Sequence, residues 1–147
     1  MSDNDNFSRI TRQWMDVFMQ RSMHGWNHYA KSTGLSMPQI NILMQLYHKG
    51  PCGISQISER FNITAAAASQ LVDKLVQAGY LNRAEDPGDR RAKMLTLSTA
   101  GLGLIKTGFE ERYRWLEELA TRLSLQEQEK IGEALVLLVN AAREADK

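Results

Sequence analysis

Residues 80–97 read YLNRAEDPGDRRAKMLTL and decide the fold of this chain. Two short runs typical of β-strands, residues 80–83 and 92–97, flank the hexapeptide Asp86-Pro87-Gly88-Asp89-Arg90-Arg91. Proline and glycine between two such runs predict the tip of a β-hairpin. We therefore expect a hairpin whose tip carries two adjacent guanidiniums.

Two short helical patterns come immediately before this hairpin. The first spans residues 55–61, and the second runs from Ala65 to Gln77, with Gly79 just past its end. Between them, residues 62–64 supply a turn and a helix N-cap. Helix, turn, helix and then a hairpin with a basic tip is the order of a winged helix-turn-helix, which indicates a protein that binds duplex DNA.

A set of residues between Ser55 and Gly101 carries a more specific signal. It consists of Ile63-Thr64, residues 69–75 (SQLVDKL), Gly79-Tyr80-Leu81, Arg83, the hexapeptide 86–91 and Leu97-Ser98-Thr99-Ala100-Gly101. With these residues, the stretch resembles the core of the MarR family of bacterial winged helix-turn-helix transcriptional regulators. The resemblance implies a dimeric DNA-binding regulator, of a kind often released from DNA by a small molecule. The flanking helices fit the family in length and order.

The composition is that of an ordinary globular protein. The chain has 147 residues, of which 43% are hydrophobic and 24% are charged, and this length suits one domain with a substantial core. No apolar run approaches the roughly 20 residues of a membrane span. The N-terminus does not resemble a signal peptide, and a lone cysteine fits a reducing compartment, so we expect a cytoplasmic protein. The formal net charge is only +1, so basic residues for DNA must be placed locally.

We expect a mainly α fold with a small β-wing and a helical dimerisation platform. Residues 1–147 form a single MarR-like domain, with a winged helix-turn-helix lobe at 35–101 and dimerisation helices at 7–32 and 102–145. The first helix, from Phe7 to about Ala30, is apolar around much of its circumference, as in a core helix or a subunit contact. A chain of this length cannot enclose it alone, which favours a homodimer. The expected interface residues are Phe7, Ile10, Trp14, Leu116, Leu135 and Leu138.

Capping patterns predict the remaining boundaries. Ser36 and Gln39 form a capping box, and Gly50-Pro51 ends the helix that follows. We expect Gly53-Ile54 to form a short third strand and Ser55 to cap the next helix. Ser98 is expected to cap a helix that runs to about Leu123. A second capping box, Ser124-Leu125-Gln126-Glu127, then begins the last helix.

The helix from Ala65 to Gln77, called the recognition helix below, presents mostly small or uncharged residues opposite its apolar stripe. Such a face approaches base edges closely, and Gln70 can pair bidentately with adenine. We expect one of the two tip arginines to enter the minor groove and the other to bind a phosphate. Which of the two enters the groove stays open. Asp86 or Asp89 is expected to pair with one of these guanidiniums. The alternative is that the helix and the charged turn are simply exposed to solvent and do not contact DNA. The expected DNA-contact residues are Thr64, Ala65, Ala66, Ser69, Gln70, Lys74, Arg83, Asp89, Arg90 and Arg91.

A cluster of large apolar side chains on the first helix is a candidate effector pocket. Methionine-rich surfaces accept varied hydrophobic ligands, so a small aromatic effector is expected between the platform and the lobe. Ordinary core packing explains the same residues equally well. The candidate residues are Met15, Phe18, Met19, Met23 and Trp26.

Other chemistries have weaker signals. His24 and His28 stand four residues apart without further ligands, so we expect no metal site, and Cys52 near His48 is a weak redox signal. The chain has no nucleophile–base pair, glycine-rich phosphate loop or carboxylate dyad, so we expect no enzyme and no cofactor. The functional prediction is a homodimeric repressor on a palindromic operator. Its alternatives are a winged-helix module that binds protein and a metal- or redox-responsive regulator.

Overall fold

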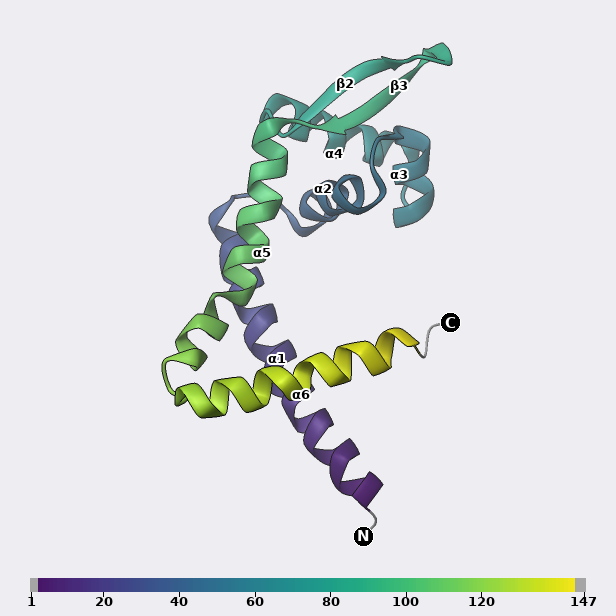
Figure 1. Ribbon diagram of the computed structural model, residues 1–147. Helices are drawn as coiled ribbons and strands as arrows, with labels where there is room; N and C mark the ends of the chain where they lie inside the picture. Colours follow the sequence, from purple (N-terminus) through teal and green to yellow (C-terminus); the bar gives the residue numbers. More distant parts are fainter. Residues whose placement is uncertain (1–2, 145–147) are drawn as a thin grey trace. The chain divides into compact units, whose positions relative to one another are not determined.

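The computed structural model describes residues 3–144 and, among these, the side chains of residues 5–89 and 93–144. The expected mainly α fold with a small β-wing is confirmed (Figure 1). The chain forms two compact units, one that reaches to Arg112 and one that begins at Tyr113. The elements are α1 (Asp3–Ser32), α2 (Met37–Lys49), β1 (Cys52–Gly53), α3 (Ile54–Phe61), α4 (Ala65–Gln77), β2 (Leu81–Asp86), β3 (Asp89–Leu97), α5 (Thr99–Ala120) and α6 (Leu125–Glu144).

Short-range hydrogen bonds explain where α2 and α3 begin. The predicted capping box of α2 is present, because Ser36 Oγ accepts from the Gln39 N–H at 3.4 Å and Gln39 Oε1 accepts from the Ser36 N–H at 2.9 Å. The predicted cap of α3 is wrong. Gln56 Oε1 accepts from the Gly53 N–H at 2.9 Å, so the helix begins at Ile54 and Ser55 lies within its first turn.

The later helices start as predicted, but α5 is shorter and α1 is longer than expected. Ser98 Oγ accepts from the Gly101 N–H at 3.0 Å and caps α5. That helix ends at Ala120 rather than Leu123, because residues 121–123 form a turn that leads into the Ser124–Glu127 capping box. Hydrogen bonds from the Ser124 backbone and hydroxyl hold the pKa of the Glu127 carboxyl below its usual range. α1 spans Asp3–Ser32, beyond both ends of the predicted helix.

The three strands form an antiparallel sheet in the order β1-β3-β2. The third strand is Cys52–Gly53 rather than Gly53-Ile54, and Cys52 pairs with Leu95. The hairpin turn is shorter than predicted. Asp86 pairs with Asp89, so Pro87-Gly88 alone make the turn, while residues 90 and 91 belong to β3. The register shifts between Glu85 and Asp86, opposite residues 90–92.

The hydrophobic core lies in the first unit, beneath the sheet and among α2, α3, α4 and the first half of α5. Trp26 and Tyr29 of α1 pack against it from outside. The core therefore fixes the orientation of α4 with respect to the hairpin, which is the geometry that a winged helix-turn-helix needs. Its buried members are Ile42, Leu43, Leu46, Cys52, Ile57, Ala68, Val72, Leu75, Leu81, Leu95, Leu104 and Ile105.

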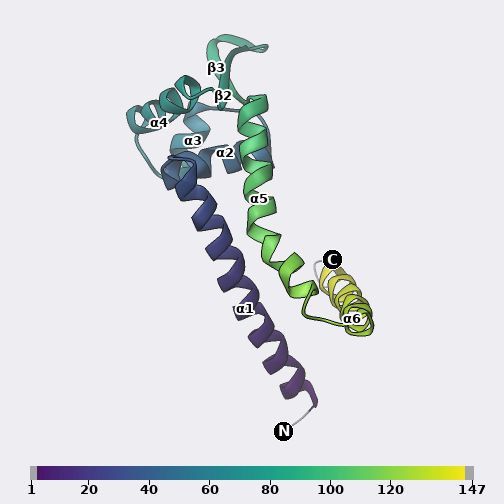
Figure 2. The ribbon, with the colours of Figure 1, turned by 90° about the vertical axis from the view of Figure 1, so that its left-hand side faces the viewer.

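The start of α5 packs directly on the connection between α4 and β2, at the base of the hairpin (Figure 2). Ser98 Oγ donates to the Gly79 carbonyl at 2.6 Å, and the Ser98 N–H donates to the Tyr80 carbonyl at 3.1 Å. A Cβ atom at position 101 would lie 2.1 Å from the Tyr80 carbonyl oxygen, so only glycine fits there.

A second close approach joins α5 to α1. The Tyr29 hydroxyl donates to the Leu104 carbonyl at 2.9 Å. A Cβ atom at Gly108 would lie 2.6 Å from Trp26 Cζ3. Trp26 also contacts Phe109, with ring centroids 6.1 Å apart. The C-terminal half of α1 is therefore held against the same helix that packs on the hairpin base.

Candidate nucleic-acid interface

A tight turn between α3 and α4 sets the start of the recognition helix, which is α4. Asn62 adopts the left-handed conformation with φ of 51° and ends α3, since its N–H donates to the Glu59 carbonyl at 3.2 Å. Thr64 is the N-cap, and its Oγ1 accepts from the Ala67 N–H at 3.1 Å. The first N–H groups of the helix lack intrahelical acceptors, and such groups hold phosphate well. Ala65 and Ala66, which begin α4, are exposed.

The buried and exposed faces of α4 follow the predicted wheel. Ala68, Val72 and Leu75 are each 0% exposed and anchor the helix in the core. Gln70 and Lys74 are exposed on the other side, as predicted. Ser69 differs, because it is half-buried at the edge between the two faces.

An ion pair joins the hairpin to the recognition helix. Arg83 Nη2 on β2 lies 2.5 Å from Asp73 Oδ1 on α4, and the two side chains are 33% and 46% exposed. The sequence prediction assigned Arg83 to DNA and gave Asp73 no role. The pair could not be predicted from spacing, because residues ten positions apart become neighbours only through the turn at Gly79, where φ is 79°.

A second ion pair joins the two strands of the hairpin. Lys93 Nζ lies 3.9 Å from Glu85 Oε1, and both side chains are more than half exposed. The prediction had assigned no role to Lys93. Asp86 Oδ1 accepts from the Gly88 N–H at 2.8 Å and fixes the turn. The expected pairing of Asp86 or Asp89 with a tip arginine stays a prediction. Asp89 is exposed, and the side chains of Arg90 and Arg91 lie outside the described residues.

The candidate effector residues lie along α1 and differ in exposure. Met15, Met19 and Met23 are 56%, 48% and 44% exposed and form a stripe along α1. Phe18 is half-buried, with its ring 6.3 Å from that of Trp14, while Trp26 packs on Phe109. We call the three exposed methionines the methionine stripe.

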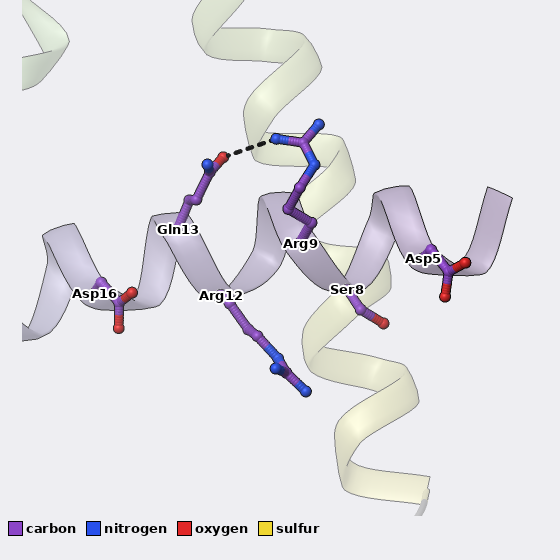
Figure 3. A pocket seen from close by; sticks show the side chains of 6 residues that line it. All are labelled: Asp5, Ser8, Arg9, Arg12, Gln13 and Asp16. Carbon is purple, nitrogen blue, oxygen red and sulfur yellow. Dashed lines mark hydrogen bonds between the residues drawn. The ribbon is translucent and has the colours of Figure 1, made fainter. Parts of the chain in front are cut away.

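The N-terminal half of α1 also has a hollow with a polar lining (Figure 3). Arg9 Nη1 donates to Gln13 Oε1 at 3.4 Å, and Arg9 Nη2 donates to Asn6 Oδ1 at 2.9 Å. The lining side chains are all polar or charged and come from one helix, so the hollow lacks the apolar lining expected for an aromatic effector. Its lining residues are Asp5, Ser8, Arg9, Arg12, Gln13 and Asp16.

The residues expected at a subunit interface lie on both compact units. Phe7 and Ile10 of the first unit are 57% and 51% exposed, and Trp14 is half-buried. In the second unit Leu135 and Leu138 are 40% and 37% exposed, and Leu116 is half-buried. Both units therefore present large apolar side chains to solvent in the single chain.

The residues considered for other chemistries are placed as follows. Cys52 is buried in β1, and burial raises the pKa of its thiol, which disfavours the reactive thiolate. His24 and His28 are exposed on α1, and the described residues hold no group of three side chains suited to a metal ion. Within residues 3–144, no helix combines the length and apolarity needed to cross a membrane.

Sequence comparisons connect this geometry to known proteins. A model of the MarR family matches residues 35–93, which include α2, α3, α4 and most of the hairpin. The HTH-type transcriptional regulator MhqR of Bacillus subtilis is 30% identical over 109 residues, which are 74% of this chain and 75% of MhqR. YxaD of the same organism, an uncharacterised HTH-type transcriptional regulator, is 24% identical over 90% of this chain and 92% of its own length.

Solved structures share the whole fold. The transcriptional regulator Tm0710 from Thermotoga maritima has a TM-score of 0.78 and 26% identity, over 97% of this chain and 99% of its own. A MepR variant from S. aureus, solved bound to an oligodeoxyribonucleotide, has a TM-score of 0.63 and 21% identity, over 92% of this chain and 97% of its own.

Proposed function

This chain belongs to the MarR family of transcriptional regulators, and from that premise we propose that it is a homodimeric repressor that binds a palindromic DNA operator. The observation that supports this proposal most is the joint placement of α4 and the hairpin. Both are anchored in one core, and the Arg83–Asp73 pair ties them together. A lobe of this kind places one helix in the major groove and a wing beside it.

The proposed contacts fall into two classes. Gln70 is the candidate for reading base edges, since it is exposed on the outer face of α4. The remaining residues are proposed to hold phosphate or to line the path of the duplex. They are Thr64, Ala65, Ala66, Ser69, Lys74, Asp89, Arg90 and Arg91. Arg83 has a different proposed role, because it positions the hairpin through its ion pair with Asp73.

A homodimer is proposed because apolar side chains on α1 and α6 are exposed in the single chain. A two-fold symmetric pair buries the same surfaces of both copies. It also presents two recognition helices to successive major grooves, about 34 Å apart, and hence prefers a palindrome. We propose repression because a dimer bound at its operator would cover duplex DNA to which the transcription machinery must bind.

We also propose that a small aromatic ligand weakens operator binding. The methionine stripe supports this idea, since methionine accommodates varied apolar ligands and a second subunit would turn the stripe into a lined pocket. A ligand shifts the equilibrium only by its differential affinity for the two arrangements of the dimer.

The deciding experiment is operator selection. The purified protein is mixed with randomised duplexes and with the duplex upstream of its own coding sequence, and bound DNA is sequenced. We expect enrichment of a palindrome whose half-sites lie one helical turn apart, and a reporter behind that site should fall in expression when the protein is made. Binding without sequence preference, together with a stable protein partner, would favour the alternative of a protein-interaction module.

A further inference from the structure

The first half of α5 is joined at one point to the end of the recognition helix and at another point to α1. We propose that the two side chains that make these joints, Ser98 and Tyr29, are positioning residues that fix the recognition helix relative to α1. They thereby determine the half-site spacing that the protein accepts. This consequence rests on the proposed homodimer, whereas the two joints are features of a single chain.

The first joint is made by the hydroxyl of Ser98. Its oxygen accepts from the Gly101 N–H at 3.0 Å, which caps α5, and its proton is donated to the Gly79 carbonyl at 2.6 Å. A serine hydroxyl has one proton to donate, and an N-cap uses only the oxygen as an acceptor. The bond to Gly79 is therefore a separate link, which ties α5 to the connection that follows the recognition helix.

That connection is bonded in turn to the last turn of the recognition helix. The Gly79 N–H donates to the Val76 carbonyl at 3.0 Å, and the Tyr80 N–H donates to the Leu75 carbonyl at 2.9 Å. The carbonyls of Gly79 and Tyr80 accept from Ser98. The connection therefore bonds to α4 through its N–H groups and to α5 through its carbonyls, so a tilt of α5 is passed directly to the end of α4.

The second joint is made by Tyr29 of α1. Its hydroxyl donates to the Leu104 carbonyl at 2.9 Å. Within an α-helix that carbonyl already accepts from the N–H four residues later, so the backbone of α5 does not need this bond. The ring also lies against α5, because a Cβ atom at Gly108 would lie 3.1 Å from Tyr29 Cε1. Tyr29 therefore links α1 to α5 by a hydrogen bond and by close packing.

The packing around the second joint leaves little room for α1 to slide along α5. A Cβ atom at Gly25 would lie 2.6 Å from the Glu111 carbonyl oxygen, so the two helix backbones approach closely there. Ile105, next to the second joint, is 0% exposed in the core. At the helical rise, Ser98 and Leu104 lie only about 9 Å apart along α5. The segment between the two joints therefore behaves as one rigid piece.

The course of α1 gives the joints their consequence for DNA binding. α1 is one continuous helix, and its N-terminal half carries the proposed subunit contacts of the first unit. One added base pair moves a half-site about 3.4 Å along the duplex and turns it about 35°. A recognition helix that is fixed relative to α1 cannot follow that change, so an operator with altered spacing should bind more weakly.

Operators with altered spacing test the role of Ser98. The selected palindrome is compared with versions that have one base pair added or removed at the centre, and the spacing penalty is the ratio of the two dissociation constants. Ser98→Ala and Ser98→Asp should each lower the parental penalty about two- to tenfold, which is the range that one hydrogen bond contributes. Aspartate keeps the acceptor that caps α5 but lacks the donated proton, so this variant separates positioning from capping.

The controls for Ser98 keep either the hydroxyl or the joint. Ser98→Thr keeps the hydroxyl and should keep the parental penalty. Ser36→Ala removes a different N-cap, whose hydroxyl bonds to Gln39 in the first turn of α2, and should also keep it. A ratio of two affinities cancels any effect that weakens both operators alike, such as the charge of the aspartate. A parental penalty in both Ser98→Ala and Ser98→Asp would overturn the role of Ser98.

Tyr29→Phe tests the second joint, since it removes the hydroxyl and keeps the ring against Gly108. The spacing penalty should fall about two- to tenfold here as well. Tyr47→Phe, which removes the hydroxyl of another half-buried tyrosine, is the matched control and should leave the penalty unchanged. If Tyr29→Phe also keeps the parental penalty, its hydroxyl does not position the recognition helix.

A distance measurement without DNA separates this inference from the proposed function. Spin labels on Gln77→Cys, at the exposed end of the recognition helix, report the distance between the two helices of a dimer when Cys52→Ala removes the native thiol. Ser98→Ala and Tyr29→Phe should broaden the distribution of this distance, and Ser36→Ala should not.

The possible outcomes distinguish the two proposals. Broadening in a protein that binds no operator supports the positioning role and disproves the repressor function. Operator binding with the parental distribution and penalty in every variant disproves the positioning role and leaves the repressor function standing. A protein that shows no distance between subunits disproves the homodimer and, with it, this inference.

Discussion

The guanidinium of Arg83 on β2 contacts the carboxylate of Asp73 on α4, with 2.5 Å between Nη2 and Oδ1. The pair spans from the wing to the recognition helix. Because both side chains are partly exposed, such a pair contributes only about 0–1 kcal/mol to stability. Its main consequence is therefore geometric: it ties the orientation of the wing to that of the recognition helix.

Asp73→Ala separates a positioning role of Arg83 from a direct DNA contact. If the pair positions the wing, Asp73→Ala and Arg83→Ala should each lower operator affinity by up to about fivefold, which corresponds to the roughly 1 kcal/mol that such a pair contributes at most. The double variant should then be no worse than either single one. Fluorescence anisotropy on a labelled operator measures all three variants, and thermal unfolding should show little change.

The opposite result has a clear meaning. Asp73 carries a negative charge near the proposed DNA surface, so its removal alone should strengthen binding if Arg83 grips phosphate directly. An Asp73→Ala protein that binds more tightly than the parent would return Arg83 to the set of DNA contacts.

The wing arginines are expected to contribute through phosphate or the minor groove. Arg90→Ala or Arg91→Ala should weaken binding strongly and leave the protein folded. Each lost phosphate contact should reduce the slope of log affinity against log salt by about 0.9 per wing. Titrations at several salt concentrations, with Lys106→Ala as the matched loss of one charge, check this. Two variants with unchanged affinity and slope would mean that the wing does not touch DNA.

Gln70 is expected to determine sequence preference. Gln70→Ala should relax discrimination by about 1–3 kcal/mol per half-site while binding to random DNA stays unchanged. Gln77→Ala, at the exposed C-terminal end of the same helix, is the control. An equal loss on operator and random duplexes would instead identify Gln70 as a phosphate contact.

The exposed apolar residues of the two units are expected to hold the dimer. Ile10→Glu and Leu138→Glu place a charge in the proposed interface and should produce monomers in sedimentation velocity, with a collapse of operator affinity. Leu125→Glu is the control, since Leu125 is 82% exposed at the start of α6. Removal of residues 125–147 should also give a monomeric or aggregated product. A full-length monomer with tight operator binding contradicts this prediction.

Cys52 is expected to be unreactive in the folded protein. Burial raises the pKa of its thiol, so the thiolate fraction at neutral pH falls below that of a free cysteine. Ellman's reagent should react at least about tenfold more slowly with native than with denatured protein, because reaction needs local opening of β1. Rapid native labelling, or loss of operator binding after mild peroxide, would restore the redox-responsive alternative.

Local patterns predicted much of the fold. The limits of α4, the N-cap at Thr64 and the capping box at Ser36 follow from rules that act within a few residues, and the structure agrees with them. Errors occurred where two local signals compete. The serine at position 55 suggested an N-cap. Instead, Gln56 Oε1 accepts from the Gly53 N–H, so Gly53 is the N-cap and α3 begins before Ser55, at Ile54.

Contacts between distant residues were harder to predict. The Arg83–Asp73 pair depends on how α4 meets β2, which no spacing within one element encodes. The five candidate effector residues could be assigned from the sequence to a pocket or to ordinary core, because their pattern places them on one helix but does not show which surface covers them.

The contact between Gly101 and the Tyr80 carbonyl limits how this protein can be re-engineered. Since a Cβ at position 101 would lie 2.1 Å from that oxygen, the first turn of α5 and the α4–β2 connection fit only each other. A graft that replaced the recognition helix and ended just after Tyr80 would set a foreign carbonyl against the native Gly101. We therefore expect an exchange of specificity to need the whole segment from Thr64 through the wing to Gly101, so that both sides of this contact move together.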